Sequence, residues 1–206
     1  MERDAGEEKE SRVILRQVQD HLTYMHTNLG AVQETVGLVE VFHHPTNPLP
    51  ELNYVTPRRN TAWVSGQAVQ QGLDHLATFG RASRVQYIEG LFPPLFAKTL
   101  RDLKLQVERE TPIMAYKTDG ISGQPPPKPA QSAPPDGVSI VQVNDQRGIE
   151  MWWYVLRNAF YNVLSLGVEP SFVGRDMAAV ALGQQLDFLA YRHGDPIGVA
   201  RLSIQA

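Results

Sequence analysis

The chain has 206 residues, a formal net charge of −3 and 42% hydrophobic residues, which is an ordinary globular composition. This charge gives no broad positive surface, so we expect neither nucleic acid nor an anionic membrane as a partner. The lack of cysteine excludes disulfides, thiolate nucleophiles and sulfur metal ligands. The acidic start MERDAGEEKE does not resemble a signal peptide, and no apolar run reaches bilayer length, so we expect a cytoplasmic protein.

Residues 1–117 show alternating helical and extended patterns, which predict an α+β domain. Apolar residues at steps of three and four predict an amphipathic helix over residues 11–28. A second helix is predicted over 67–79, with Ser65 as its N-cap and Gly80 at its end. The remaining predicted elements are a helix over 94–103, which starts at two prolines, and strands over 36–42, 52–56, 84–88, 105–110 and 112–116.

Residues 118–137 contain six prolines and almost no large apolar side chain. Such a segment cannot contribute to a core and is typical of an extended, semi-rigid linker. A short proline run can alternatively dock into an aromatic groove of a partner. We interpret the segment as the linker between the first domain and a second one over residues 138–206.

The second domain is predicted to contain a strand over 139–143, a helix over 150–166 and a shorter helix before residue 186. Residues 186–204 then predict a β-hairpin, because Gly194 and Pro196 lie between two runs of strand length. A strand this close to the last residue leaves unpaired backbone groups along its edge. We therefore expect further sequence, or a second copy in a homo-oligomer, to cover it.

Four histidines in the first domain raise the question of a metal site. His21 and His26 are five residues apart, so on a helix they do not share a face as an i, i+4 pair does. His43 and His44 are adjacent, so on a strand they point to opposite sides. We expect no bound metal.

Arg58 and Arg59 follow a predicted strand and precede a predicted helix, where a phosphate can bind to the helix N-terminus. The loop has no glycine cradle, and solvated arginines are the alternative interpretation. In the second domain, Trp152, Trp153, Phe160 and Tyr161 form an aromatic cluster, which we interpret mainly as core packing.

The hairpin LAYRHGDPIGVARL resembles a motif of the GNAT superfamily of N-acetyltransferases, and the match lies at the turn from Asp195 to Gly198. The predicted order of strand, two helices and hairpin is similar to the first half of that fold. The first domain is similar to its second half, because PPLFAKTLRDLKLQVERE resembles the last GNAT helix and the strand after it. The resemblance implies a tandem-GNAT protein with a mixed, mostly antiparallel sheet flanked by helices.

Two departures from the family concern the cofactor. The family's R/Q-x-x-G-x-G/A loop would correspond to PRRNTAWVSG, which lacks the glycines, and Leu100 replaces the tyrosine that many members use as a general acid. We therefore expect the first copy to be catalytically silent. In the second copy the loop would lie after Ala206, so we expect this chain to lack a complete cofactor loop.

The resemblance implies transfer of an acetyl group from acetyl-CoA to a small-molecule or peptide amine. Arg58 and Arg59 are then the candidate cofactor-binding residues, and Phe160, Tyr161 and Phe172 are the candidate acceptor-binding residues. No catalytic residue is assigned. One alternative is a non-catalytic binding or assembly module. Another is a single composite sheet, in which the two parts complete one fold.

Overall fold

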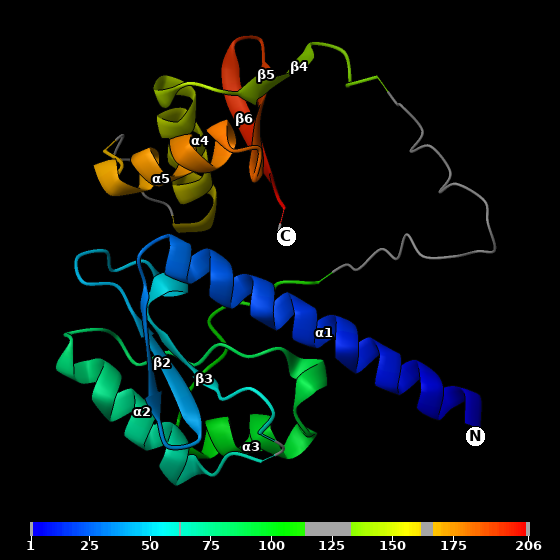
Figure 1. Ribbon diagram of the computed structural model, residues 1–206, viewed down its shortest axis with the longest axis vertical. Helices are drawn as coiled ribbons and strands as arrows, with labels where there is room; N and C mark the ends of the chain where they lie inside the picture. The colour runs from blue at the N-terminus through cyan, green and yellow to red at the C-terminus, as the bar shows by residue number, and fades with distance from the viewer. Residues whose placement is uncertain (1, 62, 114–132, 162–166, 205–206) are drawn as a thin grey trace. The chain divides into compact units, whose positions relative to one another are not determined.

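The computed structural model describes residues 2–61, 63–113, 133–161 and 167–204. The chain divides into two compact units, unit 1 (Met1–Tyr116) and unit 2 (Lys117–Ala206) (Figure 1). Each unit contains a three-stranded antiparallel sheet and helices, so the predicted α+β class is confirmed. Most of the predicted linker lies outside the described residues. Within the described ranges, no helix has the length and apolar character needed to cross a membrane.

Unit 1 has a long N-terminal helix, a small sheet with strand order β1-β2-β3 and two further α-helices (Figure 1). Its elements are α1 (Glu2–Asn28), β1 (Val32–Val36), β2 (Val39–His43), η1 (Pro50–Leu52), β3 (Tyr54–Pro57), α2 (Gly66–Thr78), η2 (Glu89–Leu91) and α3 (Pro94–Asp102).

Helix α2 packs very closely against β2 and β3 in the core of unit 1. A Cβ atom at Gly72 would lie 2.7 Å from Val39 Cγ2 and 2.8 Å from Val55 Cγ1. The opposite face of the sheet carries Phe42 and Tyr54, whose rings stack with centroids 4.8 Å apart. Both faces of this sheet are therefore packed, and the approach of α2 depends on a glycine.

Replacement of Gly72 by alanine is expected to destabilise unit 1 by about 1–2 kcal/mol. Overpacking costs about 1–3 kcal/mol, while the better helix propensity of alanine returns up to about 1 kcal/mol. Urea unfolding followed by circular dichroism measures the difference. Exposed Gln71 on the same helix provides the control, because Gln71→Ala should change stability by less than about 0.5 kcal/mol. A Gly72→Ala protein as stable as the wild type would contradict this account.

A parallel connection follows the antiparallel strands of unit 1. Val55 N–H donates to the Arg84 carbonyl at 2.9 Å, and Gln86 N–H donates to the Val55 carbonyl at 2.9 Å. These bonds form a parallel bridge between Val55, which precedes α2 in the chain, and Val85, which follows it. The predicted strand over 84–88 is thus reduced to one bridge. The carboxyl ends of β3 and of residues 84–86 point in the same direction.

Two strand predictions in unit 1 are wrong. The predicted strand over 36–42 crosses a tight turn, because Gly37 has a φ of 60° and separates β1 from β2. The predicted strand over 105–110 does not form either, and two ion pairs hold this segment. Arg84 Nε lies 2.8 Å from Glu108, and Arg109 Nη2 lies 2.6 Å from Glu51. Most of the predicted strand over 112–116 lies outside the described residues.

Unit 2 contains a sheet with strand order β4-β5-β6 and two helices (Figure 1). The predicted hairpin is confirmed, with a two-residue turn in which His193 and Gly194 both have positive φ. The predicted helix over 150–166 begins four residues earlier, and its predicted end lies outside the described residues. The elements are β4 (Val138–Val143), α4 (Gln146–Tyr161), α5 (Pro170–Ala181), β5 (Gln185–Arg192) and β6 (Asp195–Ser203).

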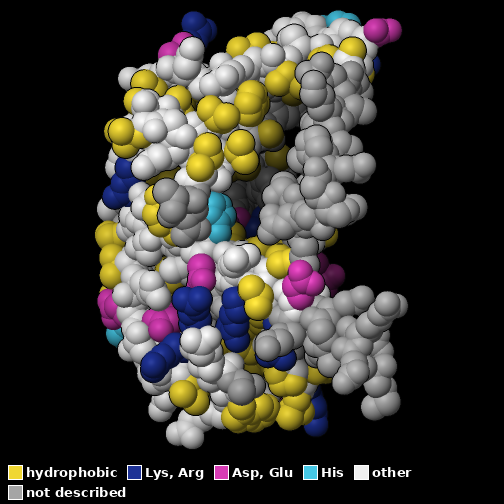
Figure 2. Space-filling model, turned by 45° about the vertical axis from the view of Figure 1, so that its right-hand side comes forward, with side chains coloured by type: hydrophobic (Ala, Val, Ile, Leu, Met, Phe, Trp, Pro, Cys, Tyr) yellow, Lys and Arg dark blue, Asp and Glu magenta, His cyan; other side chains and the backbone are white. Residues whose placement is uncertain are grey.

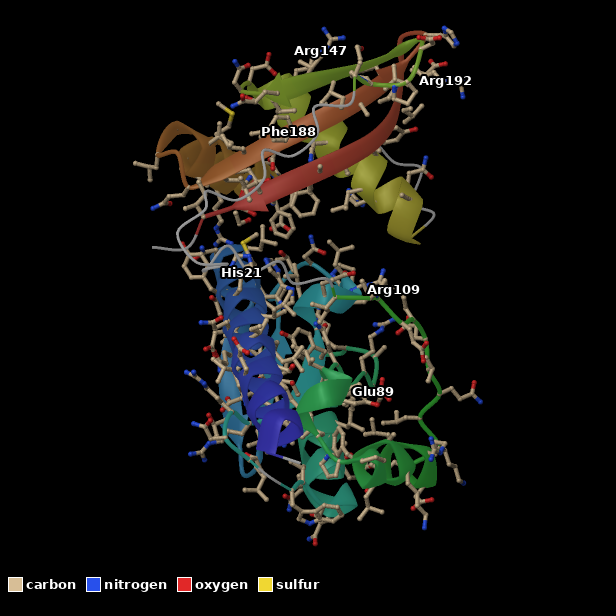
Figure 3. The ribbon with its side chains drawn as sticks, turned by 90° about the vertical axis from the view of Figure 1, so that its right-hand side faces the viewer. His21, Glu89, Arg109, Arg147, Phe188 and Arg192 are labelled. Carbon is tan, nitrogen blue, oxygen red and sulfur yellow. The ribbon has the colours of Figure 1, made fainter. Side chains whose placement is uncertain are left out.

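Helices α4 and α5 cover one face of this sheet, and Figure 3 views it from the opposite side. On the covered face, Asp187 and Leu189 are fully buried. On the other face, Ile140 and Leu202 are more than half exposed, and Phe188 is half-buried between them. One apolar face of the unit 2 sheet is therefore not covered within the unit.

Candidate functional site

An open groove of about 480 Å³ lies on unit 1 beside α1. Figure 2 shows Lys and Arg side chains close together on the surface of this unit, with Asp and Glu side chains near them. A volume of this size is in the range of small-molecule sites, about 300–1,000 Å³. The groove, called the arginine groove below, is lined by Arg12, Val13, Arg16, Gln17, Asp20 and Arg59.

The arginine groove is built from α1 and from the loop after β3. Arg12 and Arg16 are four residues apart on α1 and therefore share a face of the helix. Arg59 follows the last residue of β3 by two positions, and its Nη2 lies 2.8 Å from Asp20 Oδ2. This ion pair places the loop against the helix.

Two contacts locate the groove in the fold. Arg12 Nη2 donates to the Leu91 carbonyl at 3.5 Å, and the Arg16 guanidinium lies 6.0 Å from the centre of the Phe92 ring. Residues 91 and 92 follow the 84–86 segment, as Arg59 follows β3. The groove thus lies where the chain leaves the two parallel segments, and carboxyl ends of parallel strands are a common place for ligands.

The groove carries excess positive charge. Its lining has three arginines and one carboxylate, which leaves two positive charges uncompensated. Burial lowers the pKa of Arg16, the positive charges of Arg12 and Arg59 lower it further, and Asp20 opposes them. Arg16 Nη1 donates to Gln19 Oε1 at 2.9 Å, which orients the side chain. A bound anion would relieve this repulsion, and guanidinium groups suit phosphate oxygens in particular.

The loop between β3 and α2 differs from a glycine-rich phosphate loop, as expected from the sequence. Ser65 caps α2, because its Oγ accepts a bond from Ala68 N–H at 3.2 Å. Arg58 is exposed and does not line the groove, although its N–H donates to the Leu38 carbonyl at 3.0 Å. Leu100 packs against the core of unit 1. Of the two predicted cofactor residues, only Arg59 lies among other groove arginines.

Arg12 and Arg16 were missed by the sequence analysis. Their i, i+4 spacing is visible in the sequence and indicates a shared helix face. Nothing in the spacing indicates that Arg59 lies against the same face, because this depends on how α1 packs on the rest of unit 1.

The predicted acceptor-binding residues are placed as follows. Phe172 is buried, and its ring centroid lies 5.1 Å from that of Trp153. Trp152 and Trp153 are also buried, so the core interpretation of this aromatic pair is confirmed. The side chains of Phe160 and Tyr161 lie outside the described part of the chain. An acceptor site at these residues stays a prediction.

A cluster of imidazole and carboxylate groups lies on unit 1. His75 Nε2 is 2.6 Å from one oxygen of Glu34, and His43 Nε2 is 3.0 Å from the other. These hydrogen bonds, first from His75 and then from His43, lower the pKa of Glu34. Phe79 stacks on the His43 ring at 3.6 Å. Glu34 thus ties β1 to β2 and α2.

The other predicted histidines have structural contacts. His44 Nδ1 accepts bonds from the Thr46 and Asn47 N–H groups at 3.2 and 2.9 Å, which stabilises the loop after β2. His26 is buried in unit 1, where its Nδ1 lies 2.8 Å from the Tyr54 hydroxyl. Among the residues that the structure describes, no group of three or more His, Cys, Asp or Glu side chains is arranged to hold a metal ion.

Comparison of the whole chain with protein-family models finds no matching family. Comparisons with curated proteins and with solved structures find no significant match either. The function of the protein therefore has to be inferred from its own residues, among which the arginine groove is the strongest candidate for a site.

Proposed function

We propose that this protein is an N-acetyltransferase of the GNAT type, which transfers an acetyl group from acetyl-CoA to an amine. In such a transfer the amine nitrogen attacks the thioester carbonyl, a C–N bond forms, and the C–S bond breaks to release the CoA thiol. A base accepts the proton lost by the amine. Unit 1 is proposed to bind the cofactor without performing this chemistry, since its loop lacks glycines and Leu100 replaces the general acid.

The observation that carries the proposal is the position of the arginine groove. It lies beside the carboxyl ends of β3 and of the 84–86 segment, which are joined by a single parallel bridge between Val55 and Val85. In open sheets, ligands bind at such ends, where the topology changes. The order of β3, α2, the 84–86 segment and α3 supports the proposal, since the GNAT resemblance implies strand, helix, strand and helix for this part of the chain.

The residues of the groove fit the phosphate-bearing part of acetyl-CoA. Three guanidinium groups with a surplus of two positive charges match a ligand with several phosphate charges. The aromatic ring of Phe92, next to Arg16, adds an apolar surface beside the charges. We propose that Arg12, Arg16 and Arg59 hold the phosphates, while acetyl-CoA supplies the activated thioester.

Isothermal titration of acetyl-CoA into the full chain tests cofactor binding. We expect binding that weakens with salt, and a dissociation constant that rises at least about tenfold when Arg16 and Arg59 are both replaced by glutamine, since hydrogen bonds to charged groups contribute about 1.5–3 kcal/mol each. Exposed Arg101 on α3 is the matched control, because it lies outside the groove. Arg101→Gln should leave the dissociation constant unchanged.

Two results would contradict the groove assignment. One is the absence of acetyl-CoA binding to the wild-type chain, and the other is equal affinity of the wild type and the double variant. Release of the CoA thiol in the presence of a panel of amines tests the transfer reaction separately. Binding without thiol release from any amine would support the alternative function described next.

The alternative is a non-catalytic binding module. It is favoured by the N-terminus of α2, where Ser65 already satisfies the Ala68 N–H and no glycine follows β3 before Gly66. In this case the arginine groove binds an anion but no acetyl transfer occurs.

A further inference from the structure

The arginine groove contains an anion of its own, the carboxylate of Asp20. Asp20 Oδ2 lies 2.8 Å from Arg59 Nη2, and the two residues belong to different elements, α1 and the loop after β3. A carboxylate at this distance offers a guanidinium the same kind of charged oxygen that a phosphate offers. Asp20 therefore occupies one of the positions at which Arg59 can hold a phosphate oxygen.

The ion pair between Arg59 and Asp20 is exposed enough to exchange. The Arg59 side chain is 60% exposed, and the Asp20 side chain is 34% exposed. Exposed ion pairs of this kind are weak, because water and dissolved salt screen them. A ligand that carries more negative charge than one carboxylate can therefore displace Asp20 from Arg59.

The loop that carries Arg59 is fixed through its backbone. Arg58 N–H donates to the Leu38 carbonyl at 3.0 Å, and Thr61 N–H donates to the Arg58 carbonyl at 3.2 Å. Asn60 has a φ of 63°, in the left-handed region that asparagine adopts more readily than most residues. An exchange of partners therefore needs new side-chain torsions at Arg59, while the loop keeps its place beside α1.

The charges on α1 form a row that includes Asp20. Arg12, Arg16 and Asp20 follow one another at steps of four residues, so about 6 Å of helix separates successive members. Asp20 also interacts with Arg16, because its charge raises the Arg16 pKa that burial and the neighbouring arginines lower. When Arg59 binds another anion, Asp20 thus keeps a cationic neighbour one turn away on its own helix.

We propose that Asp20 limits the affinity of the arginine groove for ligands with two adjacent phosphates, because a ligand phosphate has to replace Asp20 on Arg59. The ligand then contacts Arg12 and Arg16 on α1 and Arg59 on the loop. Two phosphates match the two positive charges that Asp20 leaves uncompensated in the groove. This inference rests on the proposed function, in which the same groove binds the phosphates of acetyl-CoA.

Isothermal titration of inorganic pyrophosphate into the full chain at low ionic strength tests the exchange. Asp20→Asn removes the competing charge and keeps the size of the side chain. We expect it to bind pyrophosphate about three to ten times more tightly than the wild type, which is the range for loss of one exposed, competing ion pair and its repulsion of the ligand. Damage to the fold would weaken binding instead.

Orthophosphate tests the class of ligand. A single phosphate cannot contact the arginines of α1 and Arg59 as fully as two linked phosphates can. Orthophosphate should therefore bind the wild type at least about tenfold more weakly than pyrophosphate, since hydrogen bonds between charged groups are lost.

A double-mutant cycle separates exchange at Arg59 from general repulsion by the Asp20 carboxylate. In an Arg59→Gln background the carboxylate has no guanidinium on the loop to occupy, so Asp20→Asn should change the dissociation constant by less than about twofold. Asp74→Asn is the matched control, because Asp74 is exposed on α2, lies outside the groove and gives the same change in net charge. It should leave the dissociation constant unchanged.

Five results would overturn the inference. They are no pyrophosphate binding by the wild type and Asp20→Asn, no gain in affinity in Asp20→Asn, the same gain in the Arg59→Gln background, an equal gain in Asp74→Asn, and equal affinities for orthophosphate and pyrophosphate.

Titration of acetyl-CoA into the same proteins separates this inference from the proposed function. Acetyl-CoA binding without tighter pyrophosphate binding in Asp20→Asn would remove the role of Asp20 and leave the proposed function standing. Tighter pyrophosphate binding in Asp20→Asn, with no binding of acetyl-CoA, would support the exchange and contradict the proposed cofactor.

Discussion

Replacement of Arg201 by methionine is expected to destabilise unit 2 by about 3–5 kcal/mol, because it leaves two buried carboxylates without a counter-charge. Arg201 Nη2 lies 2.5 Å from Asp176 Oδ2, and its Nε lies 2.7 Å from Asp187 Oδ1. Both aspartates are almost fully buried. The guanidinium also lies 4.0 Å from the centre of the Trp152 ring, and this cation–π contact would be lost.

The two carboxylates have further partners, but these are neutral. Trp153 Nε1 donates to Asp176 at 2.8 Å, and Gln185 Nε2 donates to Asp187 at 2.9 Å. Burial alone would lower the pKa of Arg201, whereas the hydrogen bonds and charges of Asp187 and Asp176 raise it above its ordinary value. The cluster therefore depends on the cation, and methionine replaces only the apolar stem of the side chain.

Urea unfolding followed by tryptophan fluorescence measures the effect of Arg201→Met. A Trp63→Phe background restricts the signal to Trp152 and Trp153 of unit 2, and Trp63 is exposed, so its replacement is mild. Exposed Arg192 on β5 is the control, and Arg192→Met should change the free energy of unfolding by less than about 0.5 kcal/mol. A loss below about 1 kcal/mol for Arg201→Met would contradict the expected role of the ion pairs.

This cluster also shows which part of unit 2 the sequence could predict. The hairpin was predictable because Gly194, which has a positive φ, lies between two extended runs, although Pro196 lies within β6 and not in the turn. The orientation of its faces was not, since period-two hydrophobicity favours Leu186 and Phe188 as the buried side. The structure buries Asp187 instead, because Arg201 is its direct partner across the β5–β6 pair. The local hydrophobic pattern cannot show that Asp187 is buried, because its partner Arg201 lies fourteen positions later in the chain.

Part of the candidate site in unit 1 could likewise be predicted from local sequence, and part depends on how the chain packs. Arg59 was predicted from its position between a strand and a helix, which is local information. Arg12 and Arg16 lie more than forty residues earlier, and their contribution depends on the packing of α1 against Leu91 and Phe92. Strand β1 was missed for another reason, as its residues VQETV are mostly polar and exposed, and pairing with β2 forms the strand.

Acidification from pH 7 to pH 4 is expected to destabilise unit 1 through His26. Burial lowers the pKa of His26 from 6.5 to about 4. Its Nδ1 lies 2.8 Å from the hydroxyl of Tyr54, a bond that the neutral ring forms in either tautomer. Burial raises the pKa of Tyr54, so this hydroxyl stays protonated across the same range. The pair is therefore a neutral hydrogen bond in the core of the unit.

Acid destabilises the folded state because His26 binds a proton less tightly there than in the unfolded chain. Below pH 6.5 the unfolded chain binds a proton at His26 that the folded chain refuses until about pH 4. The free energy of unfolding should fall through this window and level off below it, by about 3 kcal/mol in total at 1.36 kcal/mol per pKa unit. Above pH 6.5 His26 contributes no pH dependence.

Hydrogen exchange of peptides from β2 and β3, read by mass spectrometry between pH 4 and pH 7 and corrected for the intrinsic exchange rate, follows the opening of unit 1. His26→Asn keeps a neutral acceptor near Nδ1 but cannot be protonated, so it should remove this part of the pH dependence. His21→Asn, on the same helix and outside the buried core, should retain it. If His26→Asn kept the wild-type slope, the acid sensitivity of unit 1 would have to come from carboxylates such as Glu34, whose pKa its histidine partners lower and whose stabilising bonds are lost at acidic pH.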